Sequence, residues 1–161
     1  GTGLTFREIL PATPHGTTHG VDITPAMLEK AKAKAAKTGT TNYTLAVGDA
    51  YQLNFPDHQF DLLVNNYMFD LLPEEDFGKV LTEFKRVLKP GGRIVLVNMT
   101  PGEKFPQTFW DTVYRFQPSW IGGCRGVLLA EPMRAAGFKN IHREMLSQFS
   151  FPSEILTATV G

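Results

Sequence analysis

The chain has 161 residues, enough for one domain with a hydrophobic core, and 42% of them are hydrophobic, which indicates a globular rather than a disordered protein. Sixteen basic residues balance sixteen acidic ones, so the composition lacks the basic surplus typical of nucleic-acid-binding proteins. The aliphatic runs are too short for a membrane span, and the single cysteine excludes an internal disulfide and suits a reducing, cytoplasmic compartment.

The stretch around Asp22 predicts a strand followed by a helix. Val21 and Ile23 are β-branched residues that suit a buried strand, with Asp22 between them. Thr24 and Pro25 then predict a helix start, because a hydroxyl residue caps helices and proline fits their first position. An acid at the carboxyl end of a strand can bind ribose hydroxyls or simply cap the next helix, and the residues leave both readings open.

Strands and helices alternate along most of the chain. We expect helices at 4–10, 25–37, 73–88 and about 128–136, and strands at 43–47, 61–65, 93–98, about 140–146 and about 154–160. The strand at 61–65 reads as fully buried, and the last two strands are joined by a short connection that predicts antiparallel pairing. The pattern predicts an α/β fold, a mostly parallel sheet with helices on both faces and a C-terminal antiparallel hairpin.

Several short motifs in this chain resemble those of one known family. They are Gly1-Thr2-Gly3, Gly20 to Leu28, Gly48-Asp49-Ala50, Phe60 to Asn66, and Phe84 to Arg93, which looks like the signature R-x-L-K-P-G-G. In this order they resemble the class I, seven-strand, Rossmann-like S-adenosylmethionine-dependent methyltransferases, above all the ubiquinone/menaquinone-biosynthesis type. The resemblance covers nearly the whole chain and implies a single domain over residues 1–161.

The resemblance implies methyl transfer from S-adenosylmethionine to a small-molecule or lipid-like acceptor, leaving S-adenosylhomocysteine. It places Asp22 on the ribose hydroxyls and Asp49 on the adenine amine. The cofactor-binding residues that it implies are Gly1, Gly3, Asp22, Ile23, Met27, Asp49, Ala50 and Asn65. No catalytic residue stands out, because the methyl group of the cofactor is already activated and its transfer can rest on proximity and alignment.

The acceptor side is less defined by the sequence. The candidate substrate-binding residues are Tyr67, Trp110, Tyr114 and Arg125, and the aromatic-rich segment 105–120 is the candidate wall of the site. For any one of these rings a core position is the simpler reading, and the arginine could equally be a surface residue. Asp70 is either a base or, more simply, a solvated acid in a turn. His15 and His19 lack a third ligand, so we expect no metal site.

The chain departs from the family at its start, where the family's first strand and first loop glycine are absent. A sheet without that central strand could close its flanking strands on each other, take a strand from a partner in a homodimer, or belong to a longer protein. The alternative function is therefore a truncated or degenerate methyltransferase-like domain without activity. A nicotinamide oxidoreductase is a third reading, but Phe6 stands where its fingerprint needs glycine or alanine.

Overall fold

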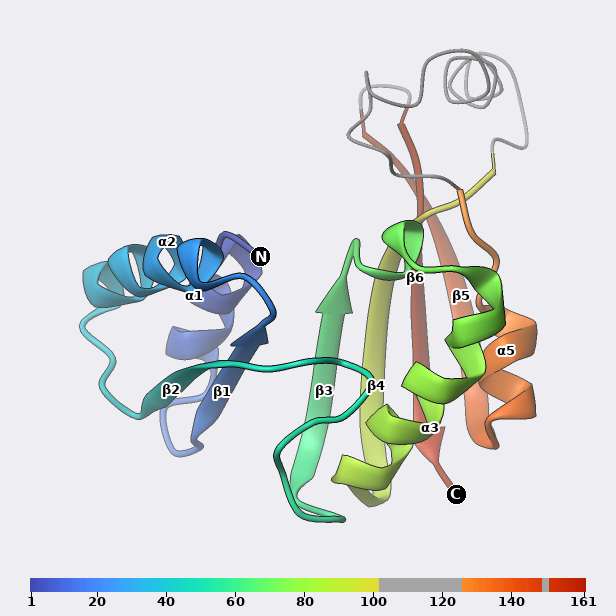
Figure 1. The fold of residues 1–161 in the computed structure, drawn as a ribbon, viewed down its shortest axis with the longest axis horizontal. Helices are drawn as coiled ribbons and strands as arrows, with labels where there is room; N and C mark the ends of the chain where they lie inside the picture. The colour runs from blue at the N-terminus through green and yellow to red at the C-terminus, as the bar shows by residue number, and fades with distance from the viewer. Residues whose placement is uncertain (102–125, 149–150) are drawn as a thin grey trace. The chain divides into compact units, whose positions relative to one another are not determined.

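The structure, a computed structural model, describes residues 1–101, 126–148 and 151–161. It divides into two compact units, Gly1–Asn54 and Phe55–Gly161, each with its own sheet and helices (Figure 1). The expectation of one domain over residues 1–161 stays a prediction.

The first unit is a two-stranded parallel sheet with two helices. Its elements are α1 (Leu4–Ala12), β1 (Thr18–Asp22), α2 (Pro25–Ala35), the 3₁₀ turn η1 (Ala36–Thr38) and β2 (Tyr43–Val47). The helices approach closely at Gly3, which has a φ of 79° and where a Cβ atom would lie 2.5 Å from the Ala31 Cα atom. Glycine is therefore required here both by the backbone conformation and by the contact between helices.

The second unit carries the larger sheet. Its elements are β3 (Phe60–Asn66), the 3₁₀ turns η2 (Phe69–Leu71) and η3 (Glu74–Asp76), α3 (Phe77–Val87), β4 (Leu88–Met99), α5 (Ala130–Ala135), β5 (Phe138–Gln148) and β6 (Phe151–Val160). The strand order is β3-β4-β6-β5, with β3 parallel to β4 and β6 antiparallel to both of its neighbours. The predicted C-terminal hairpin is confirmed.

The core of the second unit lies between this sheet and its helices. The apolar residues of α3 recur at helical spacing and are all buried: Phe77, Val80, Leu81, Phe84 and Val87. Helices α3 and α5 contact each other on one face of the sheet (Figure 1), where Ile94, Leu96 and Leu156 are fully buried. The predicted periodicity of this helix is thus confirmed by burial.

Two sequence expectations are corrected by the structure. Strand β3 is not fully buried, because it is the edge strand of its sheet, and Leu62 is 39% exposed. Ile23 is not in a buried strand: β1 ends at Asp22, and the Ile23 side chain is 67% exposed.

Candidate functional site

Asp22 ends β1 and organises the turn into α2. Its Oδ1 atom accepts a hydrogen bond from the Thr24 N–H at 2.8 Å, while the Thr24 side chain makes no capping bond. Its other oxygen pairs with the amino group of Gly1. Partial burial raises the pKa of the Asp22 carboxyl, but the hydrogen bonds from Gly1 and Thr24 outweigh it and hold that pKa below its usual value. The carboxylate is therefore charged at neutral pH.

Asp49 follows the end of the neighbouring strand. The Gly48 N–H donates to the backbone oxygen of Asp22 at 3.1 Å, and the Tyr51 N–H donates to the Asp49 Oδ1 atom at 2.9 Å. Because β1 and β2 are parallel, their carboxyl ends meet at the same edge of the sheet. The two acids that the sequence singled out are thus brought to one edge of the first unit.

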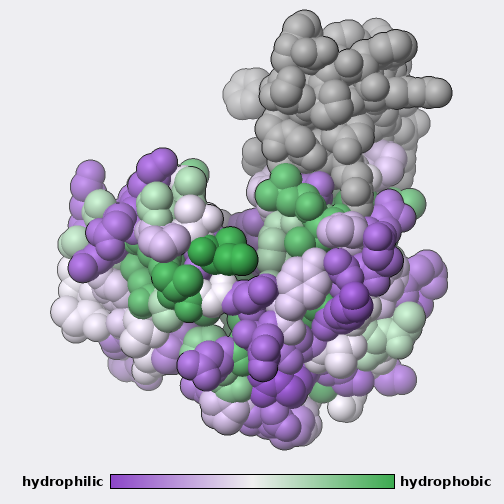
Figure 2. Space-filling model, in the orientation of Figure 1, coloured by the Kyte–Doolittle hydropathy of each residue, from purple (hydrophilic) through white to green (hydrophobic). Residues whose placement is uncertain are grey.

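Exposed apolar side chains flank this acidic edge. Ile23 follows Asp22 directly, and Val47, which is 60% exposed, lies opposite Asp22 in the strand register. Figure 2 shows hydrophobic side chains gathered on the visible face of this unit. Isolated apolar side chains on a surface are ordinary, but here they adjoin a charged carboxylate, and an adenosine needs both an apolar surface and a hydrogen-bond acceptor.

The donor and acceptor groups of this edge fit an adenosine. An ionised carboxylate offers about four lone-pair positions, and Asp22 uses two for Thr24 and Gly1, which leaves capacity for ribose hydroxyls. Met27 and Ala50 are half-buried near the two acids in sequence. The glycine at position 3 is explained by helix packing, so contact of Gly1 and Gly3 with a cofactor stays a prediction.

Two predicted residues lie at the end of β3 in the second unit. Asn65 donates from its amide nitrogen to the Met68 sulfur at 3.4 Å, and its buried Oδ1 atom has no partner among the described residues. Tyr67 has a φ of 52°, which is unusual for an aromatic residue and costs about 1–3 kcal/mol. Its N–H donates to the Val97 oxygen at 2.7 Å, and its hydroxyl lies 3.2 Å from the Ser153 Oγ atom.

Asp70 is not the solvated turn acid that the sequence favoured. It is 1% exposed, and both oxygens of its carboxylate accept the Met99 N–H, at 3.1 and 3.2 Å. The preceding Phe69 packs edge-on against Phe77 and Phe84, which draws this turn into the core. Asp70 therefore holds the end of β4, a structural role that does not need solvent access.

Polar residues of β4 and β6 that the sequence did not single out are also buried. Asn98 and Glu154 face each other in the strand register and are both fully buried. Glu154 accepts a hydrogen bond from the Arg143 Nε atom at 2.6 Å. Among the described residues, the Asn98 amide and the Glu154 Oε1 atom have no hydrogen-bond partner. Each lies in an apolar strand, and no local pattern marks it as functional.

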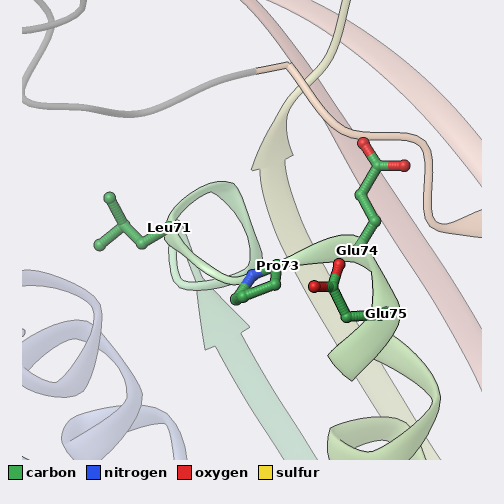
Figure 3. Close-up of a pocket in the computed structure, with 4 residues that line it drawn as sticks. All are labelled: Leu71, Pro73, Glu74 and Glu75. Carbon is green, nitrogen blue, oxygen red and sulfur yellow. The ribbon is translucent and has the colours of Figure 1, made fainter.

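The surface hollow found in the structure contains none of the site residues that the sequence predicted. Figure 3 shows a surface hollow before α3, lined by Leu71, Pro73, Glu74 and Glu75. The predicted substrate residues Trp110, Tyr114 and Arg125 lie outside the described residues. Within the described ranges, no group of three His, Cys, Asp or Glu side chains could hold a metal, and no helix is long and apolar enough to cross a membrane.

Comparison with known proteins identifies the family. The model of the methyltransferase domain family matches residues 1–92, more than half of the chain and the region that holds both acidic strand ends. The chain belongs to this methyltransferase family. The family assignment drawn from the ordered motifs is thereby confirmed, as is the S-adenosylmethionine-dependent class.

Two curated relatives show the range of the family. The chain is 30% identical over 149 residues to an arsenite methyltransferase of Halobacterium salinarum, covering 88% of this chain and 36% of the relative. It is 33% identical over 119 residues to a demethylmenaquinone methyltransferase of Bacteroides fragilis, covering 71% of this chain and 46% of the relative. The chain thus spans less than half the length of these two relatives.

The fold of this chain is also similar to that of a solved methyltransferase structure. One similar solved structure is the crystal structure of magnesium protoporphyrin IX methyltransferase from Synechocystis with S-adenosylhomocysteine bound. The match covers the whole of this chain and 71% of that protein, with a TM-score of 0.79 at 18% identity. At that identity the match shows the fold alone, and it confirms the predicted α/β class I methyltransferase fold.

Proposed function

We propose that this chain binds S-adenosylmethionine and takes part in methyl transfer to a small-molecule or lipid-like acceptor. The observation that carries the proposal is the charged Asp22 carboxylate at the carboxyl end of β1, with Asp49 at the same edge and exposed Ile23 and Val47 beside it. This edge combines hydrogen-bond acceptors with an apolar surface, which is the combination that an adenosine requires.

In this mechanism the cofactor supplies an activated methyl group on a cationic sulfur. Asp22 accepts hydrogen bonds from the ribose hydroxyls, Asp49 accepts from the adenine amine, and Ile23 and Met27 contact the purine. The chain contributes mainly orientation, because holding two reactants in line lowers the entropic part of the barrier. A general base is needed only where the acceptor atom carries a proton.

The proposed acceptor class is supported by the names of the relatives and not by this chain's own geometry. Their names include an arsenite methyltransferase, a demethylmenaquinone methyltransferase and a phosphatidylethanolamine N-methyltransferase, which favours a small or lipid-like acceptor. We assign Tyr67 to the acceptor side, with Trp110, Tyr114 and Arg125. A single domain over residues 1–161 and a cytoplasmic location remain part of the proposal.

Calorimetric titration with S-adenosylhomocysteine tests the cofactor assignment. We expect Asp22→Asn to weaken the affinity about 10- to 100-fold, the loss of one or two hydrogen bonds to a charged group. Asp61→Asn is the matched control, because Asp61 is an exposed acid paired with Lys89. Unchanged affinity in Asp22→Asn would show that this carboxylate does not hold the ribose. Titration with NADH serves as the control for ligand specificity.

A second candidate is a methyltransferase-like domain that folds without binding the cofactor. The observation that favours it is the division of the described strands into two separate hydrogen-bonded sheets. Absence of S-adenosylhomocysteine binding by a well-folded chain would support this candidate. The solution mass, measured alongside, tests whether the chain forms a homodimer.

A further inference from the structure

We propose that Tyr67 and Ser153 form a hydroxyl pair that binds the acceptor by a hydroxyl oxygen, with Ser153 as the positioning residue. The proposal rests on the proposed function for its biological meaning, because it concerns the acceptor side of the same reaction. It extends that function by adding a residue from the last strand and by naming the chemical group that is recognised.

The first observation is the backbone of Tyr67. Its φ of 52° places an aromatic residue in the left-handed region, where a Cβ atom is unfavourable. The Tyr67 N–H nevertheless donates to Val97 at 2.7 Å, so the pairing of β3 with β4 holds this conformation in place. Strained backbone conformations that the surrounding structure holds in place are concentrated at functional sites. The conformation of Tyr67 is therefore consistent with a functional role of its side chain.

The second observation is the partner of the phenol. The Tyr67 hydroxyl lies 3.2 Å from the Ser153 Oγ atom, which comes from a residue 86 positions away in the chain. Ser153 is only 4% exposed, and its backbone is paired with Met99 on one side and Leu146 on the other. Ser153 is thus a rigid anchor, whereas Tyr67 remains 43% exposed and accessible to a ligand.

The third observation is the set of residues that share this sheet face. In the strand register Val97 faces Ile155, and Met99 faces Ser153, on the alternate positions to Asn98 and Glu154. Among the described residues, no charged side chain is hydrogen-bonded to the Tyr67 hydroxyl or to Ser153. Strand β5 adds Leu146 beside Ser153 and the exposed Glu144 beside Ile155. The pair is therefore a neutral hydrogen-bonding group whose register neighbours Met99 and Leu146 are apolar, which suits an apolar acceptor with a hydroxyl group.

The chemistry of the pair leaves room for a ligand. A phenol can donate one hydrogen bond and accept others, and either hydroxyl of the pair can be the donor. In both arrangements the Tyr67 hydroxyl retains capacity for a further partner. A hydroxyl oxygen of the acceptor would fill that position, and Ser153 would fix the direction of the phenol.

The test compares two probes that differ by one hydroxyl group, 1-naphthol and naphthalene, by fluorescence titration with and without S-adenosylhomocysteine. We expect the full chain to bind 1-naphthol about fivefold to tenfold more tightly than naphthalene, the range of one hydrogen bond. Tyr67→Phe should abolish this preference, Ser153→Ala should reduce it, and the double variant should show no further loss. Thr157→Ala, on the same strand and the same face, should retain it.

Each outcome decides the proposal. No preference in the unmodified chain, or an unaltered preference in Tyr67→Phe or Ser153→Ala, would overturn it. Additive losses in the double variant would also overturn it, because the two hydroxyls would then act separately. A preference that follows the pair in a chain that does not bind S-adenosylhomocysteine supports the pair and counts against the proposed function alone. If Ser153→Ala does not fold, Ser153→Cys replaces it.

Discussion

The buried carboxylate of Asp70 was a candidate base in the sequence, but its contacts in the structure indicate a role in stability. Its two oxygens accept the Met99 N–H inside the core. We expect Asp70→Ala to lower the free energy of unfolding by about 2–3 kcal/mol, because a buried N–H loses its charged partner. Urea denaturation measures the change.

The matched control for Asp70 is the exposed acid Asp61. Its ion pair with Lys89 is solvent-exposed, so Asp61→Ala should change the free energy of unfolding by less than about 0.5 kcal/mol. Equal effects of the two substitutions would contradict the structural role of Asp70. S-adenosylhomocysteine affinity should stay the same in both variants.

In helix α3 the apolar side chains recur at helical spacing and are buried, so substitutions in this helix should change stability in predictable directions. Leu81 is fully buried, so Leu81→Ala should cost about 2–5 kcal/mol of unfolding free energy through the cavity that it leaves. Leu81→Ala is checked by urea denaturation, and an unchanged free energy of unfolding would contradict the burial of this side chain.

The opposite effect is expected at Gly78 in the first turn of α3. Gly78 is exposed, and a Cβ atom there would meet no atom within 4 Å. Gly78→Ala should therefore raise the free energy of unfolding by about 0.5–1 kcal/mol. A loss of stability in Gly78→Ala would show that this position is not the open helical site described here.

The irregular start of β4, where its register with β3 shifts, contains two adjacent glycines with different requirements. Gly91 has a φ of 74° with open space around it, whereas a Cβ atom on Gly92 would lie 2.7 Å from the Lys89 oxygen. Gly91→Asn should cost less than about 1 kcal/mol, because asparagine tolerates this conformation. Gly92→Ala should cost about 1–3 kcal/mol, because backbone atoms must move. Thermal unfolding of both variants checks the order, and the reverse order would contradict it.

At the scale of the whole molecule, the two proposals concern different parts of the chain. Hydrogen exchange followed by mass spectrometry should show that S-adenosylhomocysteine slows exchange in residues 18–50, around Asp22 and Asp49. The probe 1-naphthol should instead slow exchange around Tyr67 and Ser153. Protection by S-adenosylhomocysteine that leaves residues 18–50 unaffected would contradict the cofactor assignment, whatever the affinity.

Much of the fold could be predicted because its signals are local. Thr24-Pro25 marks the start of α2, and the spacing of the apolar residues in α3 marks its buried face. The short connection before β6 requires an antiparallel pair, and the ordered motifs identify the family. The edge position of β3 could not be predicted, because it depends on which strand pairs with which, so the exposure of Leu62 was missed.

The sequence by itself determined the helical and extended segments, the acidic ends of two strands and the methyltransferase family, because each depends on residues close together in the chain. Only the tertiary structure decided that Asp70 is buried, that Ile23 is exposed, and that Tyr67 lies beside Ser153 from 86 positions away. These outcomes depend on strand register and on what packs against each face. Local periodicity does not encode either, because both arise when distant segments exclude water together.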